Sequence, residues 1–213
     1  MDQASTPLVD IRSNALFLDF DGTLAPFAPT PDAVAASPGV IAALSALSIS
    51  MGNAVAIVTG RTIAEIDTFL SPLKPVTAGV HGLTIRRADG HVTNAPIDAG
   101  ELDRITVAFQ RLVDATPGSI VERKSHSVAI HWRQAPEHEG VLKAKAAAIV
   151  DETATFSIQH GKCVAEARMP GLNKGDAIRE LCANAPFAGR SPVFIGDDVT
   201  DEDGFAAVNA LGG

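Results

Sequence analysis

Short apolar runs and longer segments of helical periodicity alternate along the first part of the chain. Residues 15–19 form an apolar run that ends in a carboxylate, and residues 54–58 form a second apolar run. Neither run alternates between apolar and polar positions, which is typical of strands buried on both faces of a parallel sheet. Residues 38–48 and 62–70 carry apolar side chains at helical spacing. This order predicts right-handed βαβ units in a parallel sheet.

The pattern changes after about residue 79, where alternating segments and turn signals replace the buried runs. The segments that predict hairpins or paired antiparallel strands are 81–96, 119–132 and 153–168, and the predicted helices between them are 99–113 and 136–151. A predicted helix at 174–183 and a buried strand at 192–195 then restore the first pattern. The middle block is therefore predicted to be a small α+β module inside an α/β protein.

These patterns lead to a fold prediction with a discontinuous core. Residues 1–80 and 170–213 are expected to form an α/β core of Rossmann type with a parallel sheet. Residues 81–169 are expected to form an inserted α+β domain. The chain has 213 residues, 46% of them hydrophobic, which is enough for a large core.

Charge and apolar length narrow the classes of function. The net charge of −8 argues against nucleic-acid binding by a basic surface. Residues 33–60 contain no charged side chain, but Pro38-Gly39 and Gly52-Asn53 interrupt them, so a helix, a turn and a buried strand are favoured over a membrane span. We expect no membrane segment.

The chain start and the cysteines bear on location. Residues 1–5 lack a basic region of the kind that begins a signal peptide. The two cysteines, Cys163 and Cys182, suggest neither a disulfide framework nor a CxxC metal site. We expect a cytoplasmic monomer.

Two carboxylates follow the first predicted strand. Asp19 and Asp21 lie at its carboxyl end, where ligands bind in open α/β sheets. One could act as nucleophile or metal ligand and the other as acid and base, while Gly22 lets the backbone turn close to a ligand. The alternative, a strand followed by an Asp-Gly turn, would explain an isolated pair but not the whole D-x-D-G-T pattern.

Further polar groups are predicted at the same edge of the sheet. Thr59 ends the second buried strand, and Lys174 begins the helix after the inserted module. The strand at 192–195 leads into a cluster of acids that consists of Asp197, Asp198, Asp201, Glu202 and Asp203. Such a cluster repels itself unless a cation is present or most of it is solvated, and oxygen ligands favour Mg²⁺.

Each of these residues also has a simpler explanation. Thr59 could be a helix N-cap, and Lys174 alone could be a solvated charge. Glu202 and Asp203 fit an acidic first turn that complements a helix dipole. Taken together, the acids, the hydroxyl and the lysine suit phosphoryl transfer. The sequence has no P-loop, dinucleotide or serine-hydrolase motif.

These motifs resemble those of the haloacid dehalogenase superfamily of phosphatases. "DFDGTL", "VTG", Lys174 and "GDDVTD" are similar to its four motifs in order. The longer segments "VERKSHSVAIHWR", "NKGDAI" and "FIGDDVTDEDGF", with "LDFDGTLAP", "VTGR" and "GVHG", resemble the trehalose-6-phosphate phosphatase family within it. The resemblance covers about residues 14–209.

The resemblance implies a Mg²⁺-dependent phosphatase that acts on trehalose 6-phosphate. Asp19 would attack phosphorus and form an aspartyl phosphate, and Asp21 would protonate the leaving oxygen and then activate water. Asp19, the Asp21 carbonyl and Asp197 would hold the metal, with Asp198 and Asp201 in its outer shell. The implied substrate-binding residues of the core are Gly22, Thr59, Gly60, Arg61 and Lys174.

By the same resemblance the inserted module is a cap that reads the sugar. The implied sugar-binding residues are Glu122, Lys124, Arg133 and Glu166. The spacing of Glu122 and Lys124 puts them on one face of a strand, which also fits side chains that merely decorate an exposed face. His81 is as consistent with a structural role at the junction as with a substrate contact.

One departure from the family and two alternative functions remain. The family usually continues through another strand and helix, whereas this sequence ends at Gly213, so either the sheet lacks an edge or the chain is a truncated form. The enzymatic alternative is a phosphatase of another sugar phosphate. The non-enzymatic alternative is a receiver-like module, which shares the acids, Thr and Lys but lacks the D-x-D-G-T start and the cap.

Overall fold

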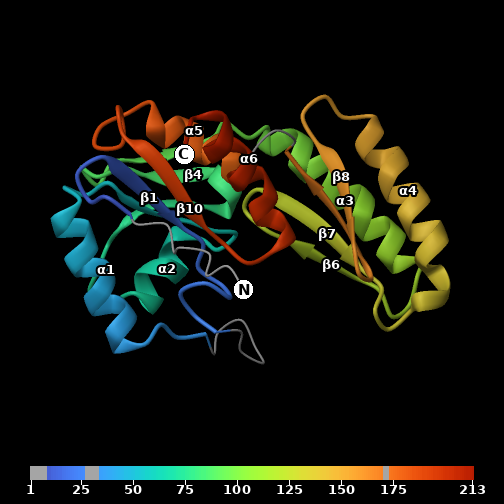
Figure 1. Cartoon of the computed structure of the whole chain (residues 1–213). Coiled ribbons are helices and arrows are strands. Elements are labelled where there is room, and N and C mark those ends of the chain that lie inside the picture. The colour runs from blue at the N-terminus through green and yellow to red at the C-terminus, as the bar shows by residue number, and fades with distance from the viewer. Residues whose placement is uncertain (1–8, 27–33, 170–172) are drawn as a thin grey trace, which may run out of the picture. The chain divides into compact units, whose positions relative to one another are not determined.

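The computed structural model describes residues 9–26, 34–169 and 173–213 (Figure 1). The chain divides into two compact units, one formed by Met1–Ala95 and Leu172–Gly213 and the other by Pro96–Gly171. The prediction about a signal peptide concerns residues 1–5 and lies outside the described residues. Within the described ranges, none of the helices has the length and apolar character needed to cross a membrane.

The larger unit, here called the core, contains a six-stranded sheet in the order β10-β1-β2-β3-β4-β5. Its strands are β1 (Asn14–Leu18), β2 (Val55–Val58), β3 (Val76–Gly79), β4 (Thr84–Arg86), β5 (Val92–Asn94) and β10 (Ser191–Ile195). Strands β10, β1, β2 and β3 are parallel, whereas β4 and β5 add an antiparallel hairpin. The expected parallel sheet is confirmed, with a mixed edge.

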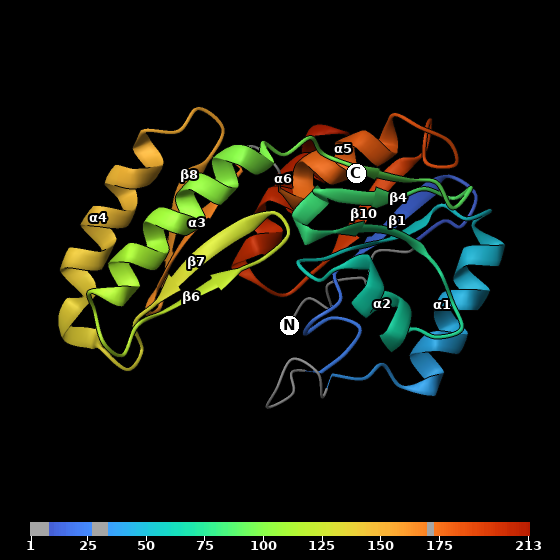
Figure 2. The same ribbon diagram turned by 180° about the vertical axis from the view of Figure 1, so that it is seen from behind.

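Helices cover both faces of this sheet, as Figures 1 and 2 show. They are α1 (Pro38–Ser50), α2 (Ile63–Phe69), α5 (Lys174–Cys182) and α6 (Glu202–Ala210), with short 3₁₀ segments η2 (Val80–Gly82) and η4 (Val199–Asp201). Local sequence sets the helix starts: the Ser37 side chain accepts a hydrogen bond from the amide of Val40. Thr62 and Glu65 form a capping box at α2.

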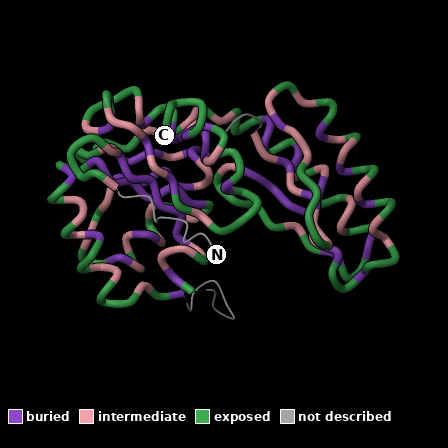
Figure 3. The backbone as a smooth tube through the Cα atoms, in the orientation of Figure 1, coloured by how far each residue is buried: buried purple, intermediate pink, exposed green. Residues whose placement is uncertain are grey.

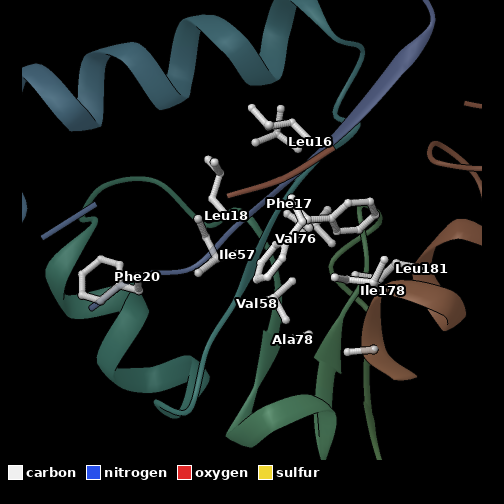
Figure 4. Close-up of a cluster of buried hydrophobic side chains, with 14 of the residues drawn as sticks. Leu16, Phe17, Leu18, Phe20, Ile57, Val58, Val76, Ala78, Ile178 and Leu181 are labelled. Carbon is white, nitrogen blue, oxygen red and sulfur yellow. The ribbon is translucent and has the colours of Figure 1, made fainter. Parts of the chain in front are cut away.

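The apolar core follows from strands that are buried on both faces. All residues of β2 are buried, as are four residues of β1. Figure 4 shows Leu16 and Leu18 on one side of β1 and Phe17 on the other, close to Ile178 and Leu181 of α5. Burial on both faces explains why residues 15–18 of β1 are all apolar.

The smaller unit, here called the cap, has one antiparallel sheet in the order β6-β7-β9-β8. Its elements are α3 (Ala99–Asp114), β6 (Ile120–Arg123), β7 (Ser127–His131), η3 (Pro136–His138), α4 (Glu139–Asp151), β8 (Ser157–Gly161) and β9 (Val164–Arg168). Val128, Ile130 and Trp132 form a buried cluster with residues of α3 and α4. The other face of the sheet therefore carries the alternate residues, many of them polar.

Each unit contains its own buried residues (Figure 3). The inserted domain was expected at residues 81–169, whereas the structure divides the chain after Ala95 and after Gly171. The hairpin of β4 and β5 joins the core sheet, since β4 pairs with β3 through Ala78 and Ile85. Its turn chemistry was predictable, but the strand it would pair with was not.

Candidate active site

The predicted catalytic residues of the core follow strands that end at one edge of the sheet. Asp19 comes directly after β1, and its amide donates to the carbonyl of Ile195 in β10 at 2.9 Å. Thr59 comes directly after β2, which pairs with β1 in parallel register. Parallel strands bring their carboxyl ends together, which places residues distant in sequence at one site.

Lys174 lies between two buried carboxylates. Its Nζ atom donates to Oδ1 of Asp19 and to Oδ1 of Asp201, each at 2.6 Å. The side chain of Lys174 is 3% exposed, that of Asp19 is 5% exposed and that of Asp201 is 0% exposed. A buried ammonium needs such partners, so the simpler explanation of Lys174 as a solvated charge is wrong.

Burial changes the acidity of Asp19. Loss of solvation raises the pKa of Asp19 above its ordinary value of 3.8, although the hydrogen bond from Lys174 works in the opposite direction. The neighbouring charge of Asp201 also raises this pKa. Asp19 is therefore a poorly solvated and comparatively basic carboxylate, which suits a nucleophile.

Asp201 organises the loop that follows β10. Its Oδ2 atom accepts from the amides of Asp197 and Asp198 at 3.0 and 2.9 Å. Gly196 makes room for this carboxylate, because a Cβ atom there would lie 2.4 Å from Cγ of Asp201. The exposed Asp198 accepts instead from the amide of Val199 at 2.6 Å and caps the 3₁₀ turn.

Three carboxylates of this edge form a possible metal site. Among the residues that the structure describes, oxygen atoms of Asp19, Asp197 and Asp201 lie within 4.8 Å of one another. Gly22 permits this grouping, because its φ is +88° and a Cβ atom there would lie 2.1 Å from Oδ2 of Asp197. The sequence placed Asp201 further out, whereas the structure brings its oxygen into the same group.

Asp21 is held by Arg61. Nε and Nη2 of Arg61 donate to the Asp21 carboxylate at 2.8 to 3.0 Å, a bidentate arrangement. The Arg61 guanidinium also lies 4.9 Å from the ring centroid of Phe69. Asp21, with a side chain 30% exposed, is more open to solvent than Asp19.

The second predicted motif forms a tight loop that two strained residues support. Thr59 is 1% exposed, and its Oγ1 accepts from the amide of Arg61 at 3.1 Å. Val80 and His81 have positive φ angles of 52° and 56°, a conformation that is uncommon for residues other than glycine and especially rare for a β-branched residue such as Val80. Their amides bond the carbonyls of Arg61 and Thr59, and the His81 ring leaves no room for a Cβ atom on Gly60.

The cap residues divide into two groups on one face of its sheet. Glu122 Oε2 lies 2.8 Å from Nε2 of His131 on the neighbouring strand. Both residues line a groove of about 480 Å³ that also includes Arg133 and Ile120. The structure therefore brings Glu122 and Arg133 to one groove, whereas Lys124 and Glu166 are not among the residues that line it.

The second group surrounds Glu166. Its Oε1 atom accepts from Oγ of Ser127 at 2.7 Å and from Nζ of Lys124 at 3.3 Å. Burial raises the pKa of Glu166, but these two donors outweigh it, and the pKa lies below the ordinary value of 4.5. Glu166 is thus held as an ionised acceptor beside Lys124.

Sequence reasoning missed several residues at these sites. It left Ser127 and His131 without a role, although both alternate with buried positions of β7 and share the polar face with Glu122. It also gave no pairing of Arg61 with Asp21, because the two residues are 40 positions apart. Of the predicted cap residues, Glu122, Lys124 and Arg133 lie in the "VERKSHSVAIHWR" segment, whereas Glu166 lies outside it.

Comparison with known proteins gives consistent results. The sequence model described as trehalose-phosphatase matches residues 17–212. The trehalose-6-phosphate phosphatase of Escherichia coli K12 is 41% identical over 201 residues, which cover 93% of this chain and 75% of that protein. A structure of Aspergillus fumigatus trehalose-6-phosphate phosphatase has a TM-score of 0.72 and 27% identity, and covers 97% of this chain and 85% of that one.

A more distant structure extends the likeness of the fold. A phosphatase of the haloalkanoate (HAD) enzyme superfamily from Bacteroides thetaiotaomicron aligns with a TM-score of 0.65 and 16% identity, over 97% of this chain and 85% of that one. The α/β core with an inserted α+β unit is therefore the HAD fold. With a family match over residues 17–212, the chain belongs to the trehalose-phosphatase family.

Proposed function

We propose that the protein hydrolyses trehalose 6-phosphate to trehalose and inorganic phosphate. The observation that carries this proposal is the buried Asp19, whose carboxylate is oriented by Lys174 beside further acids at the edge of the sheet. Membership of the trehalose-phosphatase family supports the choice of substrate. We also propose that the protein is a monomer and that it is located in the cytoplasm.

The carboxylate group fits a hard divalent cation. Asp19, Asp197 and Asp201 offer only oxygen atoms, and these lie close enough together to share one ion. We propose that Asp19 and Asp197, with the Asp21 carbonyl, hold Mg²⁺, and that Asp201 and Asp198 order the surrounding loop. The cation would reduce the repulsion between the nucleophile and the phosphate.

In the first step, the Asp19 carboxylate attacks phosphorus and the bond from phosphorus to the sugar oxygen breaks. Asp21 gives its proton to that oxygen, so trehalose leaves as a neutral alcohol. Asp21 forms a bidentate ion pair with Arg61 in the structure, and in this scheme that pair opens when Asp21 gives its proton to the leaving oxygen.

In the second step, Asp21 takes a proton from water, which attacks the phosphorus of the aspartyl phosphate. The bond between phosphorus and Asp19 breaks, and inorganic phosphate and the free carboxylate result. The acid of the first step thus becomes the base of the second, and no group is consumed.

Donors around Asp19 can bind the phosphoryl oxygens. An ammonium has three hydrogens, and Lys174 uses two of them on Asp19 and Asp201. The Thr59 hydroxyl accepts from the amide of Arg61, and its own hydrogen has no acceptor within residues 9–26, 34–169 and 173–213. We assign the remaining donors of Lys174 and Thr59, together with the loop at Gly60 and Arg61, to the phosphate.

The cap provides charged side chains for the sugar hydroxyls. Glu122 and Arg133 line its groove, and Lys124 and Glu166 lie on the same face of the sheet. Carboxylates accept from hydroxyls and cations donate to them, so this set can bind a neutral polyol. We propose that these four residues select the disaccharide.

Phosphate release from trehalose 6-phosphate tests the proposal. We expect turnover with Mg²⁺ and none in EDTA, and stronger turnover of trehalose 6-phosphate than of sucrose 6-phosphate or glucosylglycerol phosphate. Activity on p-nitrophenyl phosphate reports the core chemistry without the sugar. Turnover of p-nitrophenyl phosphate without turnover of trehalose 6-phosphate would contradict the proposed substrate. A stable aspartyl phosphate without turnover would favour a receiver-like module.

A further inference from the structure

Ser127 is a buried hydroxyl on the polar face of the cap sheet. It is 1% exposed and begins β7, and its Oγ donates to Oε1 of Glu166 on β9 at 2.7 Å. The register pairs Ser127 with Arg168 and Ala129 with Glu166. The bond is therefore a diagonal contact across the two strands, within the reach of a glutamate side chain.

The acceptor of this hydrogen bond distinguishes Ser127 from Ser119, another serine of the cap. Ser119 donates to the carbonyl of Thr116 three residues earlier, which only supports a local turn. Ser127 instead reaches a carboxylate 39 positions away. Burying a hydroxyl costs free energy unless the hydroxyl forms a hydrogen bond. Ser127 forms this bond with a carboxylate on another strand, so the bond constrains the position of Glu166.

The two oxygens of Glu166 are used unequally. Ser127 and Lys124 both donate to Oε1. Oε2 has no hydrogen-bond partner among the residues that the structure describes. The contact from Lys124 to Glu166 is long, and the Lys124 side chain is 42% exposed. Ser127 therefore constrains the Glu166 carboxylate more strongly than Lys124 does.

We propose that Ser127 is a positioning residue, whose hydroxyl fixes Glu166 so that its second oxygen is held ready to accept from a sugar hydroxyl. This inference rests on the proposed function, because it needs the cap to bind the disaccharide. A glutamate that is already fixed loses less side-chain freedom on binding, which strengthens binding without any new contact. Ser127 touches neither the phosphate nor the nucleophile in this scheme.

Steady-state kinetics of Ser127→Ala with trehalose 6-phosphate and Mg²⁺ tests the inference. We expect KM to rise about tenfold, because a hydrogen bond to a charged group is lost. We expect kcat to change by less than about twofold, because the lost interaction acts on binding alone. Ser127→Thr keeps the hydroxyl and should keep KM within about threefold of the wild-type value.

Two comparisons separate positioning from a general loss of structure. Ser125→Ala is the matched control, since Ser125 is exposed and contacts the His126 ring rather than Glu166. In a Glu166→Gln background, Ser127→Ala should raise KM by less than about twofold further, because its partner charge is already gone. Thermal unfolding of each variant checks that the cap still folds.

The outcomes distinguish the two proposals. An active wild type with an unchanged KM in Ser127→Ala would overturn this inference and leave the proposed function intact. An equal rise of KM in the alanine and threonine variants, or additive effects with Glu166→Gln, would also overturn it. A wild type that hydrolyses p-nitrophenyl phosphate but not trehalose 6-phosphate would overturn both.

Discussion

At the residue scale, the close approach of Asp197 to Gly22 depends on a missing Cβ atom. That atom would lie 2.1 Å from Oδ2 of Asp197. The positive φ of +88° adds a second reason for glycine at this position. Gly22 therefore determines where Asp197, one of the carboxylates that we propose bind the metal, lies, although glycine has no functional group of its own.

We predict that Gly22→Ala reduces Mg²⁺-dependent turnover by about 10²-fold, because Asp197 has to move by an ångström or so. Gly90→Ala is the matched control, since Gly90 also has a positive φ but nothing lies within 4 Å of its Cβ position. Both variants carry the same backbone strain. Equal activity of the two variants would show that the contact with Asp197 does not matter.

We predict that Asp19→Asn lowers turnover by at least about 10³-fold, because an amide cannot form the aspartyl phosphate. The fold should persist, since Lys174 keeps its hydrogen bond to Asp201. Asp151→Asn, at the exposed end of α4, is the control for loss of one carboxylate. Phosphate release and circular dichroism measure the two effects, and an active Asp19→Asn would refute the assigned nucleophile.

At the element scale, a single carboxylate joins α3 to the loop before β8. Glu101 accepts from the amides of Ala154 and Thr155, each at 3.1 Å, and from the Thr155 hydroxyl. The hydroxyl of Thr155, followed by the amide of Ala154, lowers the pKa of Glu101 below its ordinary value of 4.5. The folded state therefore prefers the ionised form.

We predict that Glu101→Gln lowers the melting temperature at pH 7 and that this difference shrinks at pH 3. A carboxyl whose pKa falls on folding stabilises the protein above its unfolded pKa, and this gain is lost as pH falls through the folded pKa. Glu152→Gln, exposed just after α4, should change little at either pH. A pH-independent difference for Glu101→Gln would contradict the role of its charge.

The elements also show how far the sequence could be interpreted. The strands predicted at residues 15–19 and 54–58 correspond to β1 and β2. They could be predicted because short apolar runs separated by helical segments are typical of buried parallel strands. The hairpin of β4 and β5 was found by its Asp-Gly turn. Its place in the core sheet depends on pairing with β3, and no local pattern reports which sheet a hairpin extends.

The candidate site was predictable to a similar degree. Motif residues at strand ends were brought together as expected, since topology alone determines that placement. The pairing of Arg61 with Asp21 and that of Ser127 with Glu166 depend on side-chain conformations instead. Such contacts arise only from the packed structure, so one sequence does not reveal them.

At the scale of the whole molecule, each unit has an apolar core of its own. Phe17 is 0% exposed in the core cluster, and Phe109 is 0% exposed in the cap cluster. Units with separate cores can open separately, so their stabilities need not be equal.

We predict that Phe109→Ala destabilises the cap by about 3–5 kcal/mol, because it leaves a cavity in a closed core. Hydrogen exchange should then accelerate in Pro96–Gly171 and stay slow in β1 and β2. Phe17→Ala, the matched variant, should accelerate exchange in the core instead. Uniform acceleration across both units in either variant would show that they unfold as one.

The position of Lys174 between Asp19 and Asp201 also sets the charge balance of the site. By formal charge, Asp19, Asp201 and Asp197 contribute three negative charges, and Lys174 offsets one of them. A divalent cation would bring the remaining sum to zero, whereas a monovalent cation would leave a negative charge facing the incoming phosphate dianion. With a divalent cation bound, the site of an acidic protein can therefore admit a doubly charged phosphate. The count of three carboxylates and one ammonium favours a divalent cation over a monovalent one.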